Sequence, residues 1–258
     1  MSGASLSDSS HSFSARDGTR LVWREAGEGR PVVLLHGLFS NATVNWIRFG
    51  HAAAIAARGY RVIMPDLRAH GDSGAPHDPA AYPEDVLAND CADLVAHLGL
   101  ADFDLGGFSL GARTSVRAVA AGMKPARLIL GGMGLEGLTG GARRRDFFLR
   151  AIAEFDTAKR GDDTWMAIQF MKTMKVDCTA AALLLRTFVD TPRTMLAAIT
   201  MPTLVVCGQD DADNGSAPAL AAELADARLA IIPGTHMSSV TEAALGEAMA
   251  AFLSGAAG

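Results

Sequence analysis

The feature that most constrains this chain is a series of short apolar runs separated by Ala-rich stretches of helical length. Within each run, apolar and polar residues do not alternate, which is typical of a strand buried on both faces of a sheet. The runs cover residues 31–35, 61–64, 103–105, 127–130, 203–207 and 228–232. The helical stretches cover residues 44–58, 83–98, 110–121, 217–225 and 240–252. Right-handed crossovers wind such units into a mostly parallel sheet with helices on both faces, so the pattern predicts an α/β fold.

The N-terminal part of the chain departs from this alternation. Residues 12–15 and 19–25 flank Asp17-Gly18, a hairpin turn signal, so we expect two antiparallel strands at an edge of the sheet. Residues 1–10 are polar and rich in Ser, a composition typical of a flexible leader. We therefore place this leader outside the folded core.

One interval is too long for an ordinary connection between elements. Residues 132–191 contain helical patterns but no apolar run of the strand type. We interpret this segment as a small helical cap inserted over the carboxyl edge of the sheet. The core then consists of residues 11–131 and 192–258, and cap and core belong to one domain because no low-complexity linker separates them.

Composition narrows the classes of function. The 258 residues carry a net charge of −5, without the basic excess that binding to nucleic-acid phosphates requires. No apolar stretch reaches the roughly 18 residues of a membrane span, and the first residues lack a secretion signal, so we expect a cytoplasmic protein. The three cysteines are far apart, which suggests neither a disulfide framework nor a zinc site. We expect no metal and no cofactor, and the sequence favours no particular oligomeric state.

The sharpest motif is Gly107-Phe108-Ser109-Leu110-Gly111, which follows a predicted strand and precedes a predicted helix. It matches the G-x-S-x-G nucleophile elbow, a strained turn that presents a serine hydroxyl at the end of a strand. Glycine at the two flanking positions removes the Cβ atoms that would crowd the neighbouring backbone. We therefore predict that Ser109 is the nucleophile of an acyl-transfer reaction.

The nucleophile needs a base, because a serine hydroxyl reacts poorly at neutral pH. The elbow motif is associated with a triad in the chain order Ser, then Asp or Glu, then His. Six of the seven histidines precede Ser109, so His236 is the candidate for the base. It comes shortly after the last apolar run, where a loop at the carboxyl end of a strand would bring it over the elbow.

The triad also needs a carboxylate that orients the imidazole and stabilises its charged form. The loop after the run 203–207 offers Asp210 and Asp211, with Asp213 two residues further on. Glu136, after an earlier strand, is a more remote candidate. Acidic residues often serve only to solvate a turn, and we expect that role for the carboxylates that do not contact the histidine.

The oxyanion that forms during acyl transfer needs fixed backbone N–H donors. One is expected from Leu110, directly after the nucleophile. The other is expected from the turn after the strand that ends at Leu35, where Gly37 lets the chain bend back toward the elbow. Leu38 is the first choice for this second donor and Phe39 the next.

Four motifs, taken in order, resemble those of the α/β-hydrolase superfamily, and the resemblance runs from Phe13 to the end of the chain. They are His36-Gly37, Asp66-Leu-Arg-Ala-His70-Gly-Asp-Ser73, the elbow, and Pro233-Gly-Thr-His236. The family's Gly-x-x-Asp spacing, counted from Gly208, implies that Asp211 is the triad acid.

Two positions depart from the usual pattern of the family. Ala69 stands where Gly is usual, in the turn that ends at Ser73, and Leu110 stands where many relatives have Met, Gln or Gly. Neither residue is the nucleophile. The resemblance also implies that His70 packs and forms hydrogen bonds within this turn rather than acting as a catalyst.

The same fold hosts many reactions, so the site residues have to decide among them. Dehalogenases and epoxide hydrolases that resemble this chain have Asp at the elbow, whereas this chain has Ser109. We therefore expect a serine hydrolase that acts on a small carboxylic ester or lactone through an acyl-enzyme. Phe39, Phe108, Trp165 and Met237 are expected to contact this substrate.

Other functions stay open at this point. A cofactor-free perhydrolase or acyltransferase would use the same triad with a different acceptor for the acyl group. A peptidase acting on amino termini would need cap carboxylates near the elbow, and a non-catalytic ligand receptor of this fold would keep the pocket without turnover. The run Arg143-Arg144-Arg145 is typical of a solvated helix face, although it also leaves an anionic substrate open.

Overall fold

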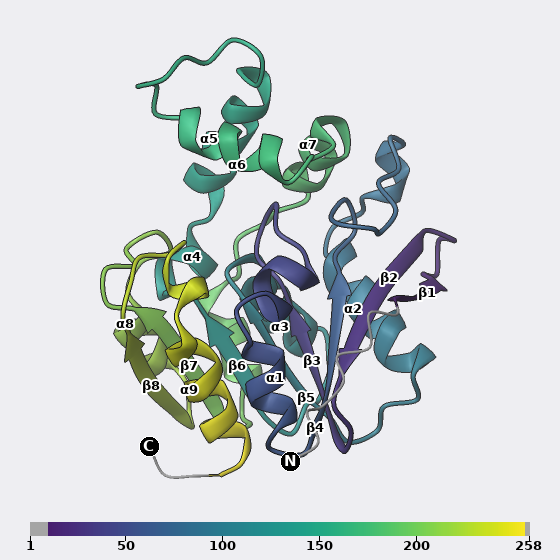
Figure 1. Ribbon diagram of the computed structural model, residues 1–258, viewed down its shortest axis with the longest axis vertical. Coiled ribbons are helices and arrows are strands. Elements are labelled where there is room, and N and C mark those ends of the chain that lie inside the picture. The colour runs from purple at the N-terminus through teal and green to yellow at the C-terminus, as the bar shows by residue number, and fades with distance from the viewer. Residues whose placement is uncertain (1–9, 256–258) are drawn as a thin grey trace.

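The computed structural model describes residues 10–255, which build an eight-stranded sheet with helices on both faces (Figure 1). The strand order is β1-β2-β4-β3-β5-β6-β7-β8. The pairs β1–β2 and β2–β4 are antiparallel and all the other pairs are parallel. The predicted α/β sheet and its antiparallel hairpin are therefore confirmed. Most of the expected leader, residues 1–9, lies outside the described residues.

Each predicted strand has a counterpart in the structure. The strands are β1 (Ser10–Ser14), β2 (Arg20–Ala26), β3 (Arg30–Leu35), β4 (Tyr60–Asp66), β5 (Asp104–Phe108), β6 (Leu128–Gly131), β7 (Thr203–Gly208) and β8 (Ala227–Ile232). The α-helices are α1 (His51–Ala56), α2 (Val86–His97), α3 (Leu110–Ala120), α4 (Leu135–Thr139), α5 (Ala142–Ala153), α6 (Trp165–Thr173), α7 (Cys178–Arg186), α8 (Ala217–Glu223) and α9 (Ala243–Leu253). Short 3₁₀ turns cover Pro79–Ala81, Arg193–Ala198 and Ser239–Thr241.

The sheet separates two apolar cores, which explains why its strands are apolar at consecutive positions. In β3, Val33 and Leu35 belong to the core shared with α2, α3 and α8, while Val32 and Leu34 belong to the core shared with α1 and α9. All four side chains are fully buried. Since successive side chains in a strand point to opposite faces, a strand covered on both sides needs apolar residues at every position.

Two predicted helices are shorter than their sequence patterns suggest. The stretch 44–58 is split by Gly50, whose φ of 81° is left-handed, into a π-helical turn (Thr43–Ile47) and α1. A left-handed residue cannot continue a right-handed helix, and glycine adopts this conformation without a Cβ penalty. Asp85, with a φ of 57°, likewise delays the start of α2 to Val86.

The interval of residues 132–191 contains α4, α5, α6 and α7. Within this fully described interval the only strand-like pairing is an isolated bridge between Arg160 and Asp162. In Figure 1, α5, α6 and α7 lie together beyond one end of the sheet. These helices bury a small apolar cluster of their own, to which Phe39 from the core contributes. The role of this segment as a cap stays a prediction.

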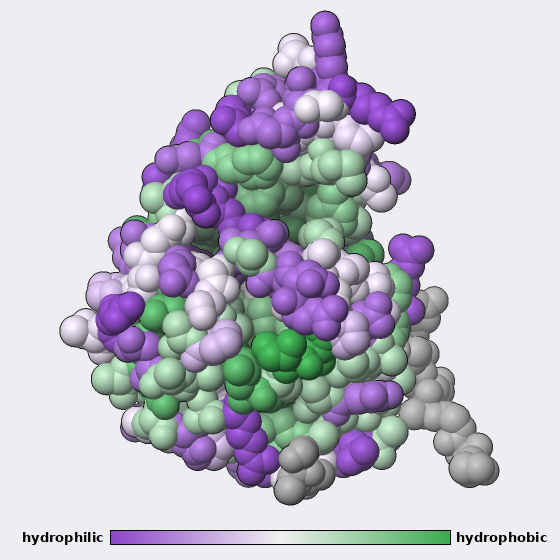
Figure 2. All heavy atoms as spheres, turned by 90° about the vertical axis from the view of Figure 1, so that its left-hand side faces the viewer, coloured by the Kyte–Doolittle hydropathy of each residue, from purple (hydrophilic) through white to green (hydrophobic). Residues whose placement is uncertain are grey.

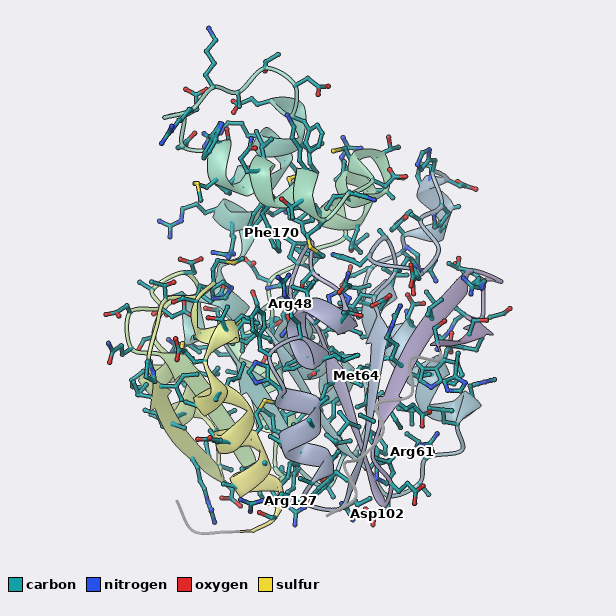
Figure 3. The ribbon with its side chains drawn as sticks, viewed as in Figure 1. Arg48, Arg61, Met64, Asp102, Arg127 and Phe170 are labelled. Atoms are coloured by element: carbon teal, nitrogen blue, oxygen red, sulfur yellow. The ribbon has the colours of Figure 1, made fainter. Side chains whose placement is uncertain are left out.

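The helices α5, α6 and α7 lie at the carboxyl end of the parallel strands. Figure 3 shows Arg61, Asp102 and Arg127, which are at or just before the starts of β4, β5 and β6, at the end of the sheet opposite to Phe170 in α6. An ion pair helps to hold this amino end together, since Arg30 Nη2 lies 2.6 Å from Asp102 Oδ1. Ligand sites in parallel sheets form at the carboxyl end, which here is the end that faces the helices.

Large apolar side chains are seldom exposed. Among the residues that the structure describes, the exposed ones are Met166, Met195, Leu229, Ile231 and Met237. Leu229 and Ile231 belong to the edge strand β8, and a hydrophobic area is visible on the side of the molecule that carries this strand (Figure 2). Within residues 10–255, no helix combines the length and the apolar character needed to cross a membrane.

Candidate active site

Ser109 lies in the turn between β5 and α3. Its backbone has a φ of 53° and a ψ of −108°, a combination that strains any residue with a side chain. The turn is held in place because the Ser109 N–H donates to the Gly131 carbonyl at 2.8 Å and the Arg113 N–H donates to the Ser109 carbonyl at 3.0 Å. Such strain costs about 1–3 kcal/mol and persists only where the surrounding structure fixes it. The strand-to-helix turn predicted from the motif is present.

The two motif glycines are required by close backbone contacts. A Cβ atom on Gly107 would lie 2.3 Å from the carbonyl carbon of Gly111, and a Cβ atom on Gly111 would lie 1.9 Å from the carbonyl oxygen of Leu35. Both distances are far below van der Waals contact, so a side chain at either position would push backbone segments apart. The close packing of α3 against β3 therefore depends on Gly111.

We expect Gly111→Ala to lower the free energy of unfolding by about 3 kcal/mol or more, because a clash with backbone cannot be relieved by a change of rotamer. Urea denaturation followed by circular dichroism measures this quantity. Gly140→Ala is the matched control, since its Cβ atom would meet no atom closer than 3.5 Å and its φ is −150°. There we expect a change within about 0.5 kcal/mol. Two equally stable variants would contradict the predicted clash.

Ser109, His236 and Asp211 form a continuous chain of hydrogen bonds. Ser109 Oγ lies 2.9 Å from His236 Nε2, and His236 Nδ1 lies 2.8 Å from Asp211 Oδ2. When Nδ1–H donates to the carboxylate, Nε2 is the atom that accepts the serine proton. Ser109 and His236 are only 8% and 5% exposed. The arrangement lets the histidine remove the hydroxyl proton as the serine oxygen attacks.

The loop after β7 fixes the position of Asp211. Its N–H donates to the Gly208 carbonyl at 3.1 Å, and its Oδ1 accepts the N–H of Asp213 at 3.1 Å. The Cys207 thiol donates to Oδ2 at 3.4 Å. Burial raises the pKa of Asp211. The hydrogen bond from His236, the positive charge of a protonated His236, and the hydrogen bonds from the Asp213 N–H and Cys207 together lower the pKa more, so the net value lies below the ordinary one. Asp211 is therefore ionised at neutral pH and able to stabilise a protonated His236.

The other candidate acids are engaged elsewhere. Asp210 is exposed and accepts a hydrogen bond from Gln209 Nε2 at 3.2 Å. Asp213 forms an ion pair with Arg144 at 3.1 Å. Glu136 accepts the Ser216 N–H at 2.7 Å. The structure thus brings Asp211, the residue implied by the spacing from Gly208, to the imidazole.

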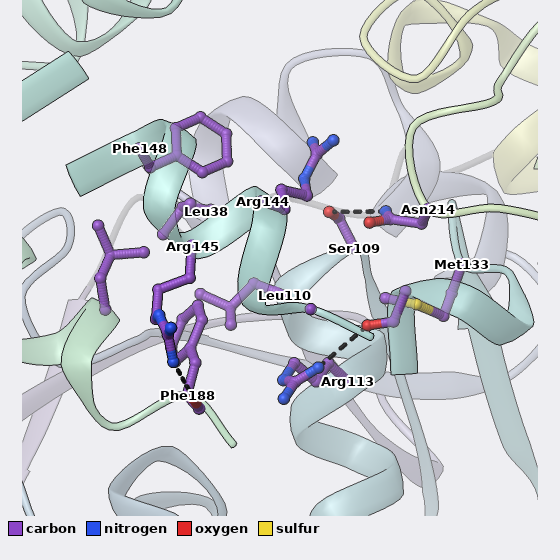
Figure 4. A pocket seen from close by; sticks show the side chains of 13 residues that line it. Leu38, Ser109, Leu110, Arg113, Met133, Arg144, Arg145, Phe148, Phe188 and Asn214 are labelled. Atoms are coloured by element: carbon purple, nitrogen blue, oxygen red, sulfur yellow. Dashed lines mark hydrogen bonds between the residues drawn. The ribbon is translucent and has the colours of Figure 1, made fainter. Parts of the chain in front are cut away.

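The two predicted oxyanion donors come from the start of α3 and from the turn after β3. Leu110 is the first residue of α3, and the first N–H groups of a helix have no acceptor within the helix. Leu38 lies in the turn after β3, which is held by the Ser40 N–H donating to the Gly37 carbonyl at 3.2 Å. Both leucines line the pocket that contains Ser109 (Figure 4). Their roles as oxyanion donors stay a prediction.

A pocket opens beside Ser109 at the carboxyl end of the sheet. Its lining consists of Leu38, Ser109, Leu110, Arg113, Met133, Gly137, Gly141, Arg144, Arg145, Phe148, Leu185, Phe188 and Asn214. Its volume of about 50 Å³ is far below the roughly 300–1,000 Å³ of sites for drug-sized ligands. The pocket therefore suits a small group.

None of the four side chains expected to contact the substrate lines this pocket. Phe108 is 3% exposed and packs in the core with its ring centroid 5.1 Å from that of His236. Phe39 is equally buried and packs against the ring of Phe148. Trp165 begins α6 and is half-buried, and Met237 is 55% exposed at the surface.

Sequence reasoning missed two polar residues of the pocket. Asn214 is 7% exposed, and its Nδ2 donates to the Gly132 carbonyl at 2.7 Å and lies 3.4 Å from Ser109 Oγ (Figure 4). Arg113 is 8% exposed and lies one helical turn after Ser109. A signal existed for both: Asn214 shares the loop of Asp211, and positions four apart in a helix lie on the same face.

Two buried histidines near the site have structural contacts. The His36 Nδ1–H donates to the Gly37 carbonyl at 2.8 Å, and its Nε2 accepts the Leu67 N–H at 2.9 Å. Burial lowers the pKa of His36 to about 4, although the Gly37 carbonyl opposes this. Burial and the charge of His36 lower the pKa of His70 to about 3, although the Arg68 carbonyl, 2.9 Å from its Nδ1, opposes this. Both rings are therefore neutral in the folded protein at neutral pH.

These two lowered pKa values predict a loss of stability in mild acid. The unfolded chain takes up protons below its ordinary histidine pKa of 6.5, whereas folded His36 and His70 do so only near pH 4 and 3. The stabilisation is thus complete above pH 6.5, and each histidine reduces it by about 1.4 kcal/mol per pH unit as the pH falls below that value. Urea denaturation between pH 7 and 5 measures this slope. His70→Gln should flatten this slope, and an unchanged slope in that variant would contradict the assignment.

The fold and the serine turn place this chain in the class of proteins with an α/β-hydrolase fold. A model of the "Alpha/beta hydrolase family" matches residues 32–251, and the chain belongs to that family. The resemblance seen in the sequence motifs is therefore confirmed. Within residues 10–255, no group of three or more His, Cys, Asp or Glu side chains is placed to hold a metal ion.

Known relatives agree with this assignment. A non-heme haloperoxidase of Rhodococcus erythropolis is 40% identical over 111 residues, which are 41% of this chain and 37% of the relative. The match thus spans little more than a third of the relative's length. Among solved structures, a hydrolase from Pseudomonas aeruginosa PA01 has a TM-score of 0.77 at 22% identity, with 96% of this chain and 99% of that chain covered. A thermophilic esterase from Thermogutta terrifontis has a TM-score of 0.76 at 23% identity, with 95% and 98% covered. At such identities the structural likeness shows a shared fold.

Proposed function

We propose that this protein is a serine-dependent hydrolase of a small carboxylic ester or lactone. The observation that carries the proposal is the hydrogen-bond chain from Ser109 through His236 to Asp211, with 2.9 Å and 2.8 Å between the paired atoms. Ser109 lines a small pocket, so a carbonyl carbon that enters the pocket can meet the serine oxygen. Membership of the α/β hydrolase family and the esterase among proteins of the same fold support this choice.

In the proposed reaction, Ser109 Oγ attacks the carbonyl carbon while His236 Nε2 takes the hydroxyl proton. The resulting oxyanion accepts hydrogen bonds from the N–H groups of Leu110 and Leu38. His236 then gives its proton to the departing alcohol oxygen, or to the ring oxygen of a lactone, and an acyl-enzyme remains. In the second half His236 removes a proton from water, and the water oxygen attacks the acyl carbon. The bond between this carbon and Ser109 Oγ then breaks, His236 returns the proton to Ser109 Oγ, and the acid leaves. Asp211 stabilises the protonated imidazole throughout.

We further propose that residues 132–191 act as the cap of this site. This segment contributes several residues to the lining of the pocket that contains Ser109, among them Gly137, Gly141, Arg144, Arg145, Phe148, Leu185 and Phe188. They supply much of the wall, so the segment selects which acyl or alcohol groups fit. The small volume favours a short substrate.

A second acceptor for the acyl group remains a candidate. The relative named a non-heme haloperoxidase favours testing hydrogen peroxide as an alternative to water. A peroxide acceptor would leave the acyl-enzyme and the roles of Ser109 and His236 unchanged, so the two functions differ only in the product.

The proposal is tested with a panel of p-nitrophenyl esters from acetate to palmitate, together with simple lactones. We expect turnover that is fastest with the short esters, because the pocket is small. Adding hydrogen peroxide or an alcohol and analysing the products separates hydrolysis from transfer to another acceptor. Absence of turnover on every member of the panel would count against the hydrolase and in favour of the peptidase or receptor alternatives.

A further inference from the structure

The lining of the pocket beside Ser109 is rich in arginine. Three of its lining residues are arginines, Arg113, Arg144 and Arg145, and no carboxylate belongs to the lining. Figure 4 shows the three arginine side chains around Ser109 and Leu110. We call these three residues the arginine wall. A pocket for a purely neutral ester has no need of three guanidinium groups.

Arg113 is the most unusual member of the arginine wall, because it is buried without a carboxylate partner. It is 8% exposed, and its Nη1 donates to the carbonyls of Gly137 at 3.0 Å and Leu138 at 3.5 Å. Among residues 10–255 no Asp or Glu oxygen lies within 4.0 Å of its guanidinium. Burial lowers the pKa of Arg113, although nearby Asp190 opposes this. A buried cation normally has an ionic partner, so Arg113 is suited to an anion that arrives with a ligand.

Arg144 and Arg145 each have one carboxylate partner, and neither partner belongs to the pocket lining. Arg144 Nη1 lies 3.1 Å from Asp213 Oδ2 and Arg145 Nε lies 2.9 Å from Asp146 Oδ1; both arginine side chains are about one-third exposed. A guanidinium has five N–H donors, so one carboxylate partner leaves donors for a ligand. Phe188 connects the arginines, since Arg113 lies over its ring at 5.7 Å and Arg145 Nη1 donates to its carbonyl at 3.5 Å.

The first arginine of the run, Arg143, differs from its two neighbours. Arg143 is exposed and does not line the pocket. Successive residues of a helix differ by about 100° in direction, so α5 turns Arg144 and Arg145 toward the site and leaves Arg143 in solvent. The solvated face expected from the sequence therefore describes Arg143 but not its two neighbours.

We propose that the arginine wall binds a carboxylate on the substrate. The preferred substrate is then an ester or lactone that carries one free carboxylate in addition to the ester bond that is cleaved. This inference rests on the proposed function, because it places the carboxylate in the pocket of Ser109. Guanidinium groups bind carboxylates through paired, charge-assisted hydrogen bonds. The pocket lining also contains the apolar residues Leu110, Met133 and Phe188. A carboxylate, with its single negative charge, suits such a lining better than a doubly charged phosphate would.

The first test compares kcat/KM for mono-p-nitrophenyl glutarate with that for the neutral p-nitrophenyl pentanoate. We expect the ratio of kcat/KM for the anionic ester to kcat/KM for the neutral ester to be at least about ten in the wild type. Arg144→Gln and Arg145→Gln should each reduce this ratio about tenfold, as expected for losing a hydrogen bond to a charged group. Arg143→Gln is the matched control and should keep the ratio. A wild-type ratio of one or less, or an equal loss in Arg143→Gln, overturns the proposal. Arg113 is left intact because its replacement endangers the fold.

The second test measures binding without turnover. Monomethyl glutarate is titrated into Ser109→Ala by calorimetry, and into Ser109→Ala combined with Arg144→Gln or Arg143→Gln. We expect affinity to fall about tenfold with Arg144→Gln only. Binding that depends on Arg144, together with no ester turnover, would refute the hydrolase and keep the anion site. Serine-dependent turnover of neutral esters, with no binding of monomethyl glutarate, would refute the anion site and keep the hydrolase.

Discussion

Ser109→Ala is expected to lower kcat by about a millionfold on whichever ester the protein turns over fastest, the loss typical of serine hydrolases without their nucleophile. Alanine cannot form the acyl-enzyme, and the remaining rate comes from the oxyanion donors and from positioning of water by His236. Stopped assays at high enzyme concentration, with the wild type in parallel, measure this loss. A variant that keeps even a hundredth of the wild-type rate would show that Ser109 is not the nucleophile.

The fold should survive this substitution. The Ser109 hydroxyl contacts His236 at 2.9 Å and Asn214 at 3.4 Å, so its removal costs about 1 kcal/mol, and Ala experiences the same backbone strain as Ser at a φ of 53°. Ser115→Ala is the matched control, because Ser115 is a buried serine in α3, the helix that follows Ser109. Its hydroxyl donates to the Gly111 carbonyl, and Ser115 does not line the pocket. It should keep the wild-type rate. If Ser109→Ala unfolds while Ser115→Ala does not, the elbow serine is structural.

The sheet could be predicted because its strands are encoded locally. In β3, four consecutive apolar residues, 32–35, face two cores in alternation, and no polar position is tolerated where helices cover both faces. The helix breaks at Gly50 and Asp85 could not be predicted in this way. Their left-handed conformations follow from how the chain must turn to pack α1 and α2, and neither residue type demands such a conformation by itself.

The site is encoded partly by motif and partly by side-chain direction. The positions of Ser109 and His236 follow from a short motif and from chain order, both visible in the sequence. The pocket lining does not, because neighbouring residues point in different directions. Phe108 is adjacent to Ser109 but packs into the core on the other side of the turn, while Arg144 reaches the pocket and Arg143 does not. These directions depend on the exact bounds of β5 and α5, which sequence patterns define only to within a few residues.

The Ala69 turn illustrates a departure that the fold tolerates. Ala69 stands where the family usually has Gly, and its φ of 64° is left-handed. The turn keeps its hydrogen bonds nonetheless, since the Ala69 N–H donates to the Gly74 carbonyl at 3.0 Å and the His70 N–H to the Leu67 carbonyl at 2.9 Å. A left-handed alanine costs about 1–2 kcal/mol, which these contacts offset. The motif therefore identifies the turn even where one of its residues differs.

Asp211→Asn is expected to lower kcat about ten-thousandfold, the loss found when the triad acid of a serine protease is changed to its amide. Asn retains the shape of the side chain but offers an N–H where Asp211 Oδ2 accepts from His236 Nδ1, which favours the tautomer with its proton on Nε2. That tautomer cannot accept the proton of Ser109. The substitution also removes the negative charge that stabilises protonated His236, so KM should change far less than kcat. Initial rates against ester concentration, measured at pH 8, separate the two parameters.

Asp210→Asn is the matched control for the choice of acid, because it makes the same chemical change one residue earlier. Asp210 is exposed and its carboxylate accepts from Gln209 Nε2 rather than from His236, so the rate should change less than about twofold. A large loss of kcat in Asp210→Asn, with a normal rate in Asp211→Asn, would mean that the loop rearranges when substrate binds and that the hydrogen bond at 2.8 Å belongs to the resting protein only.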